Sequence, residues 1–347
     1  MSAPDSICIL RLSAIGDVSN AVSVVQAIQR HYAGVPITWV IGKIEAQLLE
    51  GLPGIEFVVF DKHAGWRGYL ALRRALAGRR FDVLLHMQLA LRANLAGLCI
   101  SARRRIGYDR ARSKELHSLF INERIASARG MHVLDGFRQF GEHLGIPLVE
   151  PEWRIPVSLG DRQWAMANLP SGTGRHLLVC PAASAAERNW LPERYAALAD
   201  HATASGFAVT LCGGPAAMEG ELARQICRHA ATPLNNLVGR TTLKQLQALL
   251  QQATLVVAPD TGPAHMANAV GTPVIGLYGH SNPGRTGPYC WRHYVVDTYH
   301  DTLLQQSGKT AEQVAWGKRL KHPQLMQNIS VERVVAMFDR VVAERAL

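Results

Sequence analysis

The stretch that decides the fold is LVVAPDTGPAHMANAVGTPVIGLYG, residues 255–279. It begins with a continuous apolar run at 255–258 and passes through a loop rich in Gly and Pro. A short helical segment at 263–270 and a second apolar run at 273–277 follow. Continuous runs of Val, Ile and Leu joined by a helix are typical of parallel strands covered on both faces. The stretch therefore predicts a strand–helix–strand unit of a parallel sheet.

The same alternation of strands and helices runs along the whole chain. Further strands are predicted at 6–12, 37–41, 57–60, 81–86, 176–180 and 208–212. Helices are predicted after the first strand and at 46–52, 69–77, 91–100, 134–144, 192–204, 218–229, 243–252 and 330–345. Residues 147–174 contain four prolines and no long periodic segment, which predicts a linker. Two such series predict an α/β protein with two doubly wound parallel sheets and a cleft between them.

Composition excludes several classes of protein. With 48% hydrophobic and 18% charged residues, the chain is neither disordered nor collagen-like. It has no apolar run of the roughly 18 residues that a membrane-spanning helix needs. The first residues lack the pattern of a secretory signal, and the six cysteines are scattered without a CxxC pair. We expect a cytoplasmic protein with reduced thiols and no zinc site.

The net charge of +10 is concentrated in one region. Between Trp66 and Lys114 there are twelve Lys and Arg residues but only two acids, Asp82 and Asp109. Such a field favours an anionic partner, which can be a nucleic acid, an acidic membrane surface, or a phosphorylated or carboxylated substrate. A basic face that serves only solubility is the alternative interpretation.

The first candidate loop is SAIGD at 13–17, directly after the first strand. In doubly wound sheets, ligands bind at the carboxyl ends of strands. Gly16 allows a tight turn there, and Asp17 begins the following helix. Asp17 is a candidate catalytic carboxylate, but an Asp at a helix start is also a common cap. The loop lacks the complete GxGxxG of a dinucleotide site, which disfavours a nicotinamide enzyme.

The second candidate loop is PDTGPAH at 259–265. Gly262 followed by Pro263 presents the free N–H groups and the positive dipole end of a helix, which is a site for phosphate or diphosphate. Thr261 adds a hydroxyl group, and His265 is either a ligand of the loop's anion or a core residue.

Two further loops follow strands of the second half. The loop at 181–190 offers Ser184 and Arg188, and an arginine there can neutralise a departing phosphate or lie on the surface. The turn GGP at 213–215 precedes Glu219 and is a candidate site for the ribose of a nucleotide.

In their order and spacing these motifs resemble the heptosyltransferases of lipopolysaccharide core assembly, glycosyltransferase family 9. The resemblance covers nearly the whole chain and rests on SAIGD, CPAAS…ERNW (180–190), GGPAAMEGE (213–221), LVGRTTL (237–243), the stretch 258–279 and NPGRTGPY (282–289). It implies a GT-B type fold, with an acceptor domain at 1–160 and a nucleotide-sugar domain at 175–329. It also implies a final helix, at about 330–347, that joins the first domain.

The resemblance implies inverting transfer of heptose from ADP-L-glycero-β-D-manno-heptose, without a metal or other cofactor. The sequence agrees in having no Asp-x-Asp, the carboxylate pair of metal-dependent sugar transferases. The implied partners are the ADP-heptose donor, an anionic lipid A–Kdo or inner-core acceptor, and the cytoplasmic face of the inner membrane as a peripheral contact. Nucleic acid is not among them.

Residue by residue, the resemblance makes Asp17 the general base on the acceptor hydroxyl. Arg188 stands where better-known members have Lys and would meet the charge on the leaving ADP. The donor-binding residues are Ser184, Arg188, Glu219, Asp260, Thr261, Gly262 and His265. The acceptor-binding residues, drawn from the basic region, are Arg67, Arg73, Arg74, Arg103 and Arg104.

Other functions stay open at this stage. The same family could act on a protein or another glycan, or use a different nucleotide-sugar. A non-catalytic nucleotide-binding module would conserve the loops but not need Asp17. A nicotinamide dehydrogenase fits the strand and helix pattern alone, because fold does not determine function.

Overall fold

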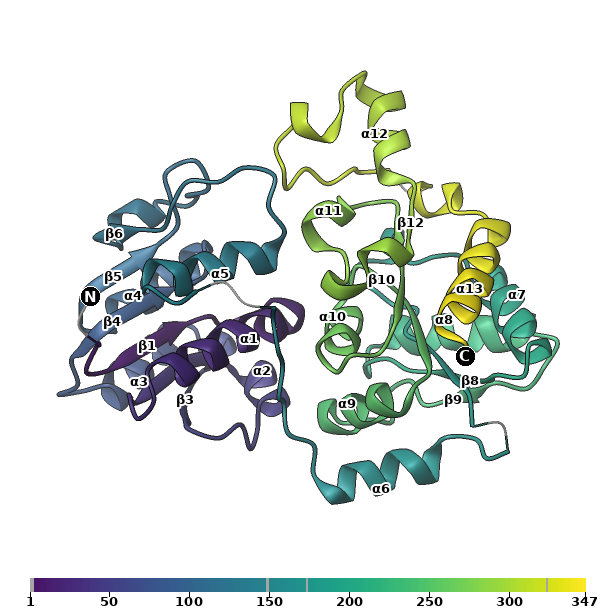
Figure 1. Cartoon of the computed structure of the whole chain (residues 1–347), viewed down its shortest axis with the longest axis horizontal. Helices are drawn as coiled ribbons and strands as arrows, with labels where there is room; N and C mark the ends of the chain where they lie inside the picture. Colours follow the sequence, from purple (N-terminus) through teal and green to yellow (C-terminus); the bar gives the residue numbers. More distant parts are fainter. Residues whose placement is uncertain (1–2, 148–149, 173, 323) are drawn as a thin grey trace. The chain divides into compact units, whose positions relative to one another are not determined.

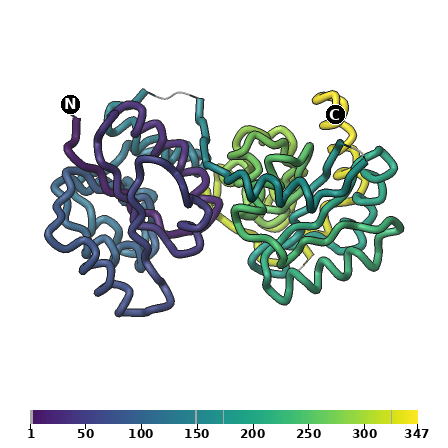
Figure 2. Tube along the Cα trace, turned by 90° about the horizontal axis from the view of Figure 1, so that it is seen from below, coloured from purple at the N-terminus to yellow at the C-terminus, as the bar shows by residue number. Residues whose placement is uncertain are grey.

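A computed structural model describes residues 3–147, 150–172, 174–322 and 324–347. The chain divides into two compact units, Met1–Pro156 and Val157–Leu347. Each unit is built on a six-stranded sheet (Figure 1). Figure 2 traces the first unit in purple to blue and the second in teal to yellow. The predicted α/β class with two doubly wound sheets is confirmed.

The sheet of the first unit has the strand order β3-β2-β1-β4-β5-β6, and every neighbouring pair is parallel. Its strands are β1 (Ile7–Leu10), β2 (Ile37–Gly42), β3 (Ile55–Phe60), β4 (Phe81–His86), β5 (Ala102–Gly107) and β6 (Glu123–Arg124). Its helices are α1 (Ile15–His31), α2 (Lys43–Leu48), α3 (Trp66–Ala75), α4 (Leu91–Leu98) and α5 (Val133–His143). The sequence analysis did not predict β5, because its arginines interrupt the apolar pattern of a buried strand.

The sheet of the second unit has the strand order β12-β11-β10-β7-β8-β9 and is parallel throughout. Its strands are β7 (His176–Val179), β8 (Ala208–Leu211), β9 (Asn235–Asn236), β10 (Leu255–Pro259), β11 (Val274–Tyr278) and β12 (Val295–Asp297). Its helices are α6 (Leu159–Asn168), α7 (Pro192–Ala204), α8 (Ala217–His229), α9 (Leu243–Gln252), α10 (Gly262–Ala269), α11 (Pro283–Thr286), α12 (Tyr299–Ser307) and α13 (Val331–Arg345).

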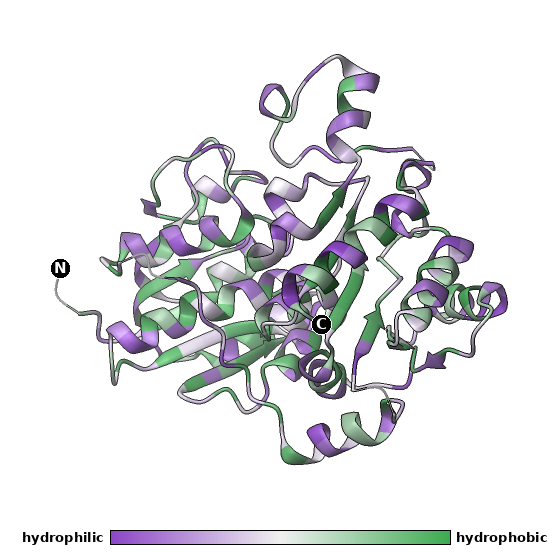
Figure 3. Ribbon diagram, turned by 45° about the vertical axis from the view of Figure 1, so that its right-hand side comes forward, coloured by the Kyte–Doolittle hydropathy of each residue, from purple (hydrophilic) through white to green (hydrophobic). Residues whose placement is uncertain are grey.

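The central strands form the cores of the two units. Every residue of β1 is buried, as is every residue of β10 and β11. Figure 3 shows strands that are mostly hydrophobic and helices that carry both hydrophobic and hydrophilic residues. Continuous apolar strands need cover on both faces, which the helices of a doubly wound fold provide.

Each sheet has one point at which the chain reverses the direction in which it adds strands. In the first sheet this point lies between β1 and β4, and in the second it lies between β7 and β10. Ligands of doubly wound proteins bind at the carboxyl ends of the strands beside such a point. The topology therefore singles out the loops after these four strands.

Two predictions of organisation differ from the structure. The predicted linker at 147–174 contains α6. This helix begins at the Ser158 cap and packs against α9. Residues 148, 149 and 173 of the stretch lie outside the described residues. The helix has a single buried residue, Ala165, so its hydrophobic periodicity is weak. The boundary between the units falls after Pro156 instead of within 160–175.

The final helix was predicted to join the first domain, but the structure groups it with the second unit. Val334, Phe338 and Val341 of α13 are buried in the core of that unit. The helix packs against α7, β11 and β12. The Phe338 ring lies edge-on to Phe207, the residue before β8. None of the described helices is both long and apolar enough to cross a bilayer.

Candidate active site

Asp17 lies at the reversal point of the first sheet, in the first turn of α1. Its carboxylate accepts a hydrogen bond from the backbone N–H of Ala14 at 3.4 Å, which is one half of a capping box, since the Ala14 side chain cannot accept the other bond. The same oxygen forms an ion pair with Arg11. The side chain is 34% exposed, so a reactant can reach it. Asp17 thus caps its helix and remains an accessible carboxylate.

Arg11 is a site residue that the sequence analysis missed. Its guanidinium donates from Nη1 to the carbonyl of Met87 at 2.6 Å and from Nη2 to Asp17. The side chain is 11% exposed and lies over the Phe137 ring, 5.2 Å from its centroid. The available signal was a basic residue directly after the buried run ICIL.

Gln88 joins the loops that follow β1 and β4. Its Oε1 accepts from the backbone N–H of Leu12 at 2.7 Å, and its Nε2 donates to the Ser13 hydroxyl at 3.3 Å. Together with the bond from Arg11 to Met87, these contacts fix the Asp17 loop to the end of β4. A partly buried network of this kind holds the carboxylate in one orientation.

A cavity of about 560 Å³ opens at the carboxyl ends of β1 to β4. The cations among its lining residues are Lys43, Lys62 and Arg92, and none of these lies within ion-pairing distance of a carboxylate in the described part of the chain. Three carboxylates also line it: Asp61 accepts from the N–H of His63, Glu115 accepts from the N–H of Leu91, and burial raises the pKa of Glu45. The formal charges of the lining cations and carboxylates balance, and the three cations are the groups that can meet an anionic part of a ligand.

None of the five predicted acceptor arginines lines this cavity. Arg67, Arg73 and Arg74 are exposed on α3. Arg103 and Arg104 lie in the amino-terminal half of β5, at the opposite end from the cavity. Arg104 is held there by two bonds to Glu123, of 2.9 and 2.8 Å, and these bonds lower the pKa of Glu123 to about 2. Lys43, Lys62 and Arg92 were missed because only the fold brings their loops together.

Asp260 is the centre of the corresponding loop in the second unit, directly after β10. Its Oδ2 accepts from the hydroxyls of Ser281 at 2.7 Å and Thr286 at 3.2 Å. Burial raises the pKa of this carboxyl, but His265, Ser281 and Arg188 outweigh burial and hold the pKa at about 2. Asp260 is therefore an anion that organises its neighbours and has little surface left for a ligand.

Arg188 joins the loops after β7 and β10, at the reversal point of the second sheet. It is the last residue of the short 3-10 helix Ala186–Arg188. Its Nη2 donates to the carbonyl of Asp260 at 2.6 Å, and its Nη1 donates to the Ser184 hydroxyl at 3.1 Å. The structure thus brings Ser184, Arg188 and Asp260 together.

The first turn of α10 supplies the groups that could hold an anion. The Thr261 hydroxyl donates to the carbonyl of Pro259 at 3.2 Å and makes no capping bond to the helix. The backbone N–H groups that begin at Gly262 therefore stay available at the positive end of the helix dipole. His265 lies one turn in, with Nε2 at 3.8 Å from Asp260 Oδ1 and a buried Nδ1 that has no partner among the described residues.

Glu219 closes the neighbouring turn after β8. Its Oε2 accepts from the backbone N–H of Gly214 at 2.6 Å. A Cβ at Gly213 or Gly214 would come within 2.8 Å of this carboxylate, so a side chain at either position would displace the end of Glu219. Glu219 shapes the turn next to the Arg188 loop, because β8 is adjacent to β7.

Comparison with known proteins assigns the chain to one family of enzymes. Residues 69–338 match glycosyltransferase family 9 (heptosyltransferase). The chain belongs to this family. It is 42% identical to the lipopolysaccharide core heptosyltransferase OpsX of Haemophilus influenzae, over 98% of this chain and 97% of that protein.

Two solved structures resemble this family 9 chain in fold. The glycosyl transferase family 9 protein of Veillonella parvula superposes with a TM-score of 0.80 at 22% identity, over 98% of this chain and 97% of that one. The ADP-heptose lps heptosyltransferase II of E. coli superposes with a TM-score of 0.74 at 20% identity, over 99% of this chain and all of that one. The fold is of the GT-B type, and the protein is a glycosyltransferase.

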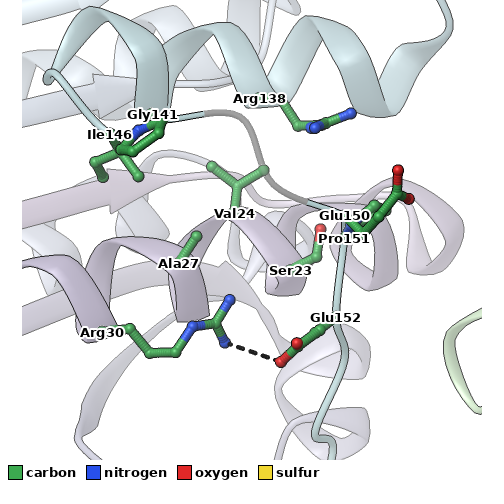
Figure 4. Close-up of a pocket in the computed structure, with 11 residues that line it drawn as sticks. Ser23, Val24, Ala27, Arg30, Arg138, Gly141, Ile146, Glu150, Pro151 and Glu152 are labelled. Carbon is green, nitrogen blue, oxygen red and sulfur yellow. Dashed lines mark ion pairs between the residues drawn. The ribbon is translucent and has the colours of Figure 1, made fainter.

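A second hollow in this family 9 protein is too small for a sugar. It measures about 30 Å³, against about 560 Å³ for the cavity at the carboxyl ends of β1 to β4. Figure 4 shows it between α1 and α5, with Arg30 and Glu152 paired at 3.7 Å beside it. In the described part of the chain, no group of three His, Cys, Asp or Glu side chains is placed to hold a metal ion.

Proposed function

We propose that this glycosyltransferase moves heptose from ADP-L-glycero-β-D-manno-heptose to the Kdo or heptose sugars of the lipopolysaccharide inner core, on the cytoplasmic face of the inner membrane. The observation that carries the proposal is the Arg188–Asp260 network at the first turn of α10. The names of OpsX and of the E. coli ADP-heptose enzyme support the acceptor and the donor respectively.

The second unit binds the donor in this proposal. The diphosphate rests on the N–H groups of the first turn of α10, with Arg188 as its cationic partner and Thr261 and His265 beside it. Asp260 acts as a positioning residue, because its oxygens already accept from Ser281 and Thr286. Glu219 and the turn that it closes lie where the ribose is expected.

The first unit binds the acceptor and supplies the base. The acceptor hydroxyl oxygen forms a bond to C1 of the heptose while the bond from C1 to the ADP oxygen breaks. Asp17 takes the hydroxyl proton, and the electron pair leaves with ADP, so the configuration at C1 is inverted. The cations Lys43, Lys62 and Arg92 suit the carboxylates and phosphates of an inner-core acceptor.

Metal independence is part of the proposal. The charge that grows on the leaving ADP is met by the Arg188 guanidinium and by the dipole of α10, which are fixed before the reaction begins. We expect transfer to continue in EDTA. Loss of transfer in chelator and its return with Mg²⁺ or Mn²⁺ would contradict this part.

The decisive experiment separates the candidate donors first and the acceptors second. Thermal unfolding is measured with ADP, ADP-heptose, UDP and NAD⁺. A ligand at one hundred times its Kd stabilises by about 2.7 kcal/mol, which is readily detected. We expect a response to ADP and ADP-heptose only. The mass of a purified inner-core acceptor is then followed for the addition of one heptose.

Each other result points to a different function. Stabilisation by ADP-heptose without transfer to an inner-core acceptor would indicate another acceptor or a non-catalytic module. Stabilisation by NAD⁺ alone would indicate a dehydrogenase.

A further inference from the structure

The helix α4 is oriented with its small residues inward and its leucines outward. Ala93, Asn94, Ala96 and Gly97 are buried against the sheet. Leu91, Leu95 and Leu98, spaced four and three residues apart on the opposite side, are 45%, 40% and 66% exposed. A helix at the surface of a globular protein normally buries its leucine stripe. This orientation places apolar surface in solvent without any gain in packing.

The neighbouring helix α3 extends this apolar surface. Its Trp66 and Leu70, one turn apart, are 67% and 40% exposed. The two helices cover the same face of the first sheet, because their inner residues share one core and Cys99 Sγ lies 3.5 Å from the carbonyl of Tyr69. The outward residues of α3 and α4 therefore form one surface, which we call the α3–α4 face.

The charge of the α3–α4 face is of one sign. The two helices together carry four arginines, Arg67, Arg73, Arg74 and Arg92, and no acid. All four arginines are exposed, and none is within ion-pairing distance of a carboxylate in the described residues. Two acids border the face: Asp61, whose backbone lies against Gly68 of α3 and whose carboxylate accepts from the N–H of His63, and Glu115, whose carboxylate is bound to the N–H of Leu91.

We infer that the α3–α4 face docks on a lipid bilayer that contains anionic headgroups. Exposed Trp and Leu side chains combined with arginines and no acids are the composition of surfaces that insert at a membrane interface. The arginines are attracted by anionic headgroups, and the apolar side chains enter the boundary between headgroups and acyl chains. The charge complementarity disfavours a neutral or basic protein partner for this face.

The inference deepens the proposed function, because a lipid-linked acceptor has to be reached at a membrane. The cavity with Lys43, Lys62 and Arg92 adjoins the α3–α4 face, since Leu91 and Arg92 belong to both. Docking by this face would bring the mouth of the cavity to the level of the headgroups. The sugar part of a lipid-anchored acceptor could then enter while its acyl chains stay in the bilayer.

The test compares binding of the full chain to phosphatidylglycerol-containing vesicles and to pure phosphatidylcholine vesicles, by co-sedimentation. The double variant Leu95→Gln/Leu98→Gln changes the face but not the cavity lining. The matched control is Leu159→Gln/Leu304→Gln, at positions that are 70% and 54% exposed in the second unit. We expect at least about tenfold weaker vesicle binding for the first pair. The control should bind like the wild type.

A charge series and two acceptors complete the design. Replacement of Arg67, Arg73 or Arg74 by Gln should weaken binding to the anionic vesicles by about fivefold each.

Leu95→Gln/Leu98→Gln should lose transfer to an acceptor embedded in vesicles but keep transfer to its deacylated, water-soluble form. Vesicle binding by the wild type without transfer to either acceptor would sink the proposed function and leave the membrane inference standing.

The inference is overturned by any of three results. The wild type could fail to bind anionic vesicles, or both leucine pairs could weaken binding equally. Alternatively, Leu95→Gln/Leu98→Gln could convert an oligomer to a monomer in sedimentation velocity, which would identify the face as a contact between two copies of the chain.

Discussion

The ion pair between Asp17 and Arg11 connects the start of α1 to the end of β4. The carboxylate caps α1 through Ala14, while Arg11 ties it to the end of β4 through Met87. A cap alone would not require an arginine that is almost completely buried. The arrangement holds the carboxylate in one orientation, and its exposed portion can accept a proton.

Replacement of Asp17 by Asn should lower kcat by roughly 10²–10⁴ with little change in ADP binding, because Asn can cap a helix but cannot act as a general base. Steady-state kinetics on a verified acceptor and calorimetric titration with ADP measure the two effects. The matched control is Asp161→Asn, at the same position of α6, where the carboxylate accepts from Ser158. If both variants keep near wild-type turnover, Asp17 is only a cap.

Asp260 should make the stability of the protein depend on pH in acid. Its pKa is lowered from 3.8 to about 2 in the folded state, so its stabilising effect is complete above the unfolded value and is lost as the pH falls towards 2. We expect Asp260→Asn to lower the free energy of unfolding near pH 7 by on the order of 2 kcal/mol. The difference from wild type should shrink as the pH is lowered below 4.

Urea unfolding of both proteins near pH 7 and near pH 3 checks this expectation. Asp301→Asn, which removes an exposed carboxylate at the start of α12, serves as the control. A difference between wild type and Asp260→Asn that does not change with pH would show that the carboxylate is not the anion that holds the loop.

Between elements, Arg188 connects two loops that lie 72 residues apart in the chain. Its two bonds leave from different nitrogens, towards Ser184 and Asp260. Lysine has one nitrogen and cannot make both bonds in this geometry, although it keeps the charge. The β7 and β10 loops therefore depend on the arginine for their spacing as well as for their charge.

Arg188→Ala should weaken ADP binding and lower kcat, each by about ten- to a hundredfold, since a charged hydrogen-bond donor is lost. Arg188→Lys should fall between this variant and the wild type. Ser184→Ala, which removes one of the two bonds but keeps the guanidinium, is the control and should change both parameters much less. Unchanged kinetics in Arg188→Ala would place the donor phosphates on α10 alone.

For the molecule as a whole, the second unit contains every residue proposed to bind the donor, together with its own core. Residues 157–347 expressed alone should therefore fold and bind ADP with an affinity close to that of the full chain. A fragment ending at residue 329 should not fold, because it lacks Val334, Phe338 and Val341 of the core. Calorimetry with ADP and circular dichroism decide both points. Stable folding of the shorter fragment would mean that α13 is dispensable to the second unit.

Local patterns in the sequence were sufficient for the fold class. Buried runs such as ICIL and LVVAP identified the central strands, because a parallel strand covered on both faces must be apolar throughout. The glycine and proline of the stretch at 259–265 identified the start of α10. The same reasoning failed for α6, whose buried surface is one alanine, and for β5, whose arginines extend past the core.

Tertiary structure decided which side chains meet. Arg11 and Gln88 reach the Asp17 loop only because β1 and β4 are neighbours across a reversal of strand order, and Arg188 reaches Asp260 for the same reason in the second sheet. The cations of the cavity come from loops after β2, β3 and β4, and the final helix completes the second core. Strand order depends on packing between distant segments, which no local window of sequence contains.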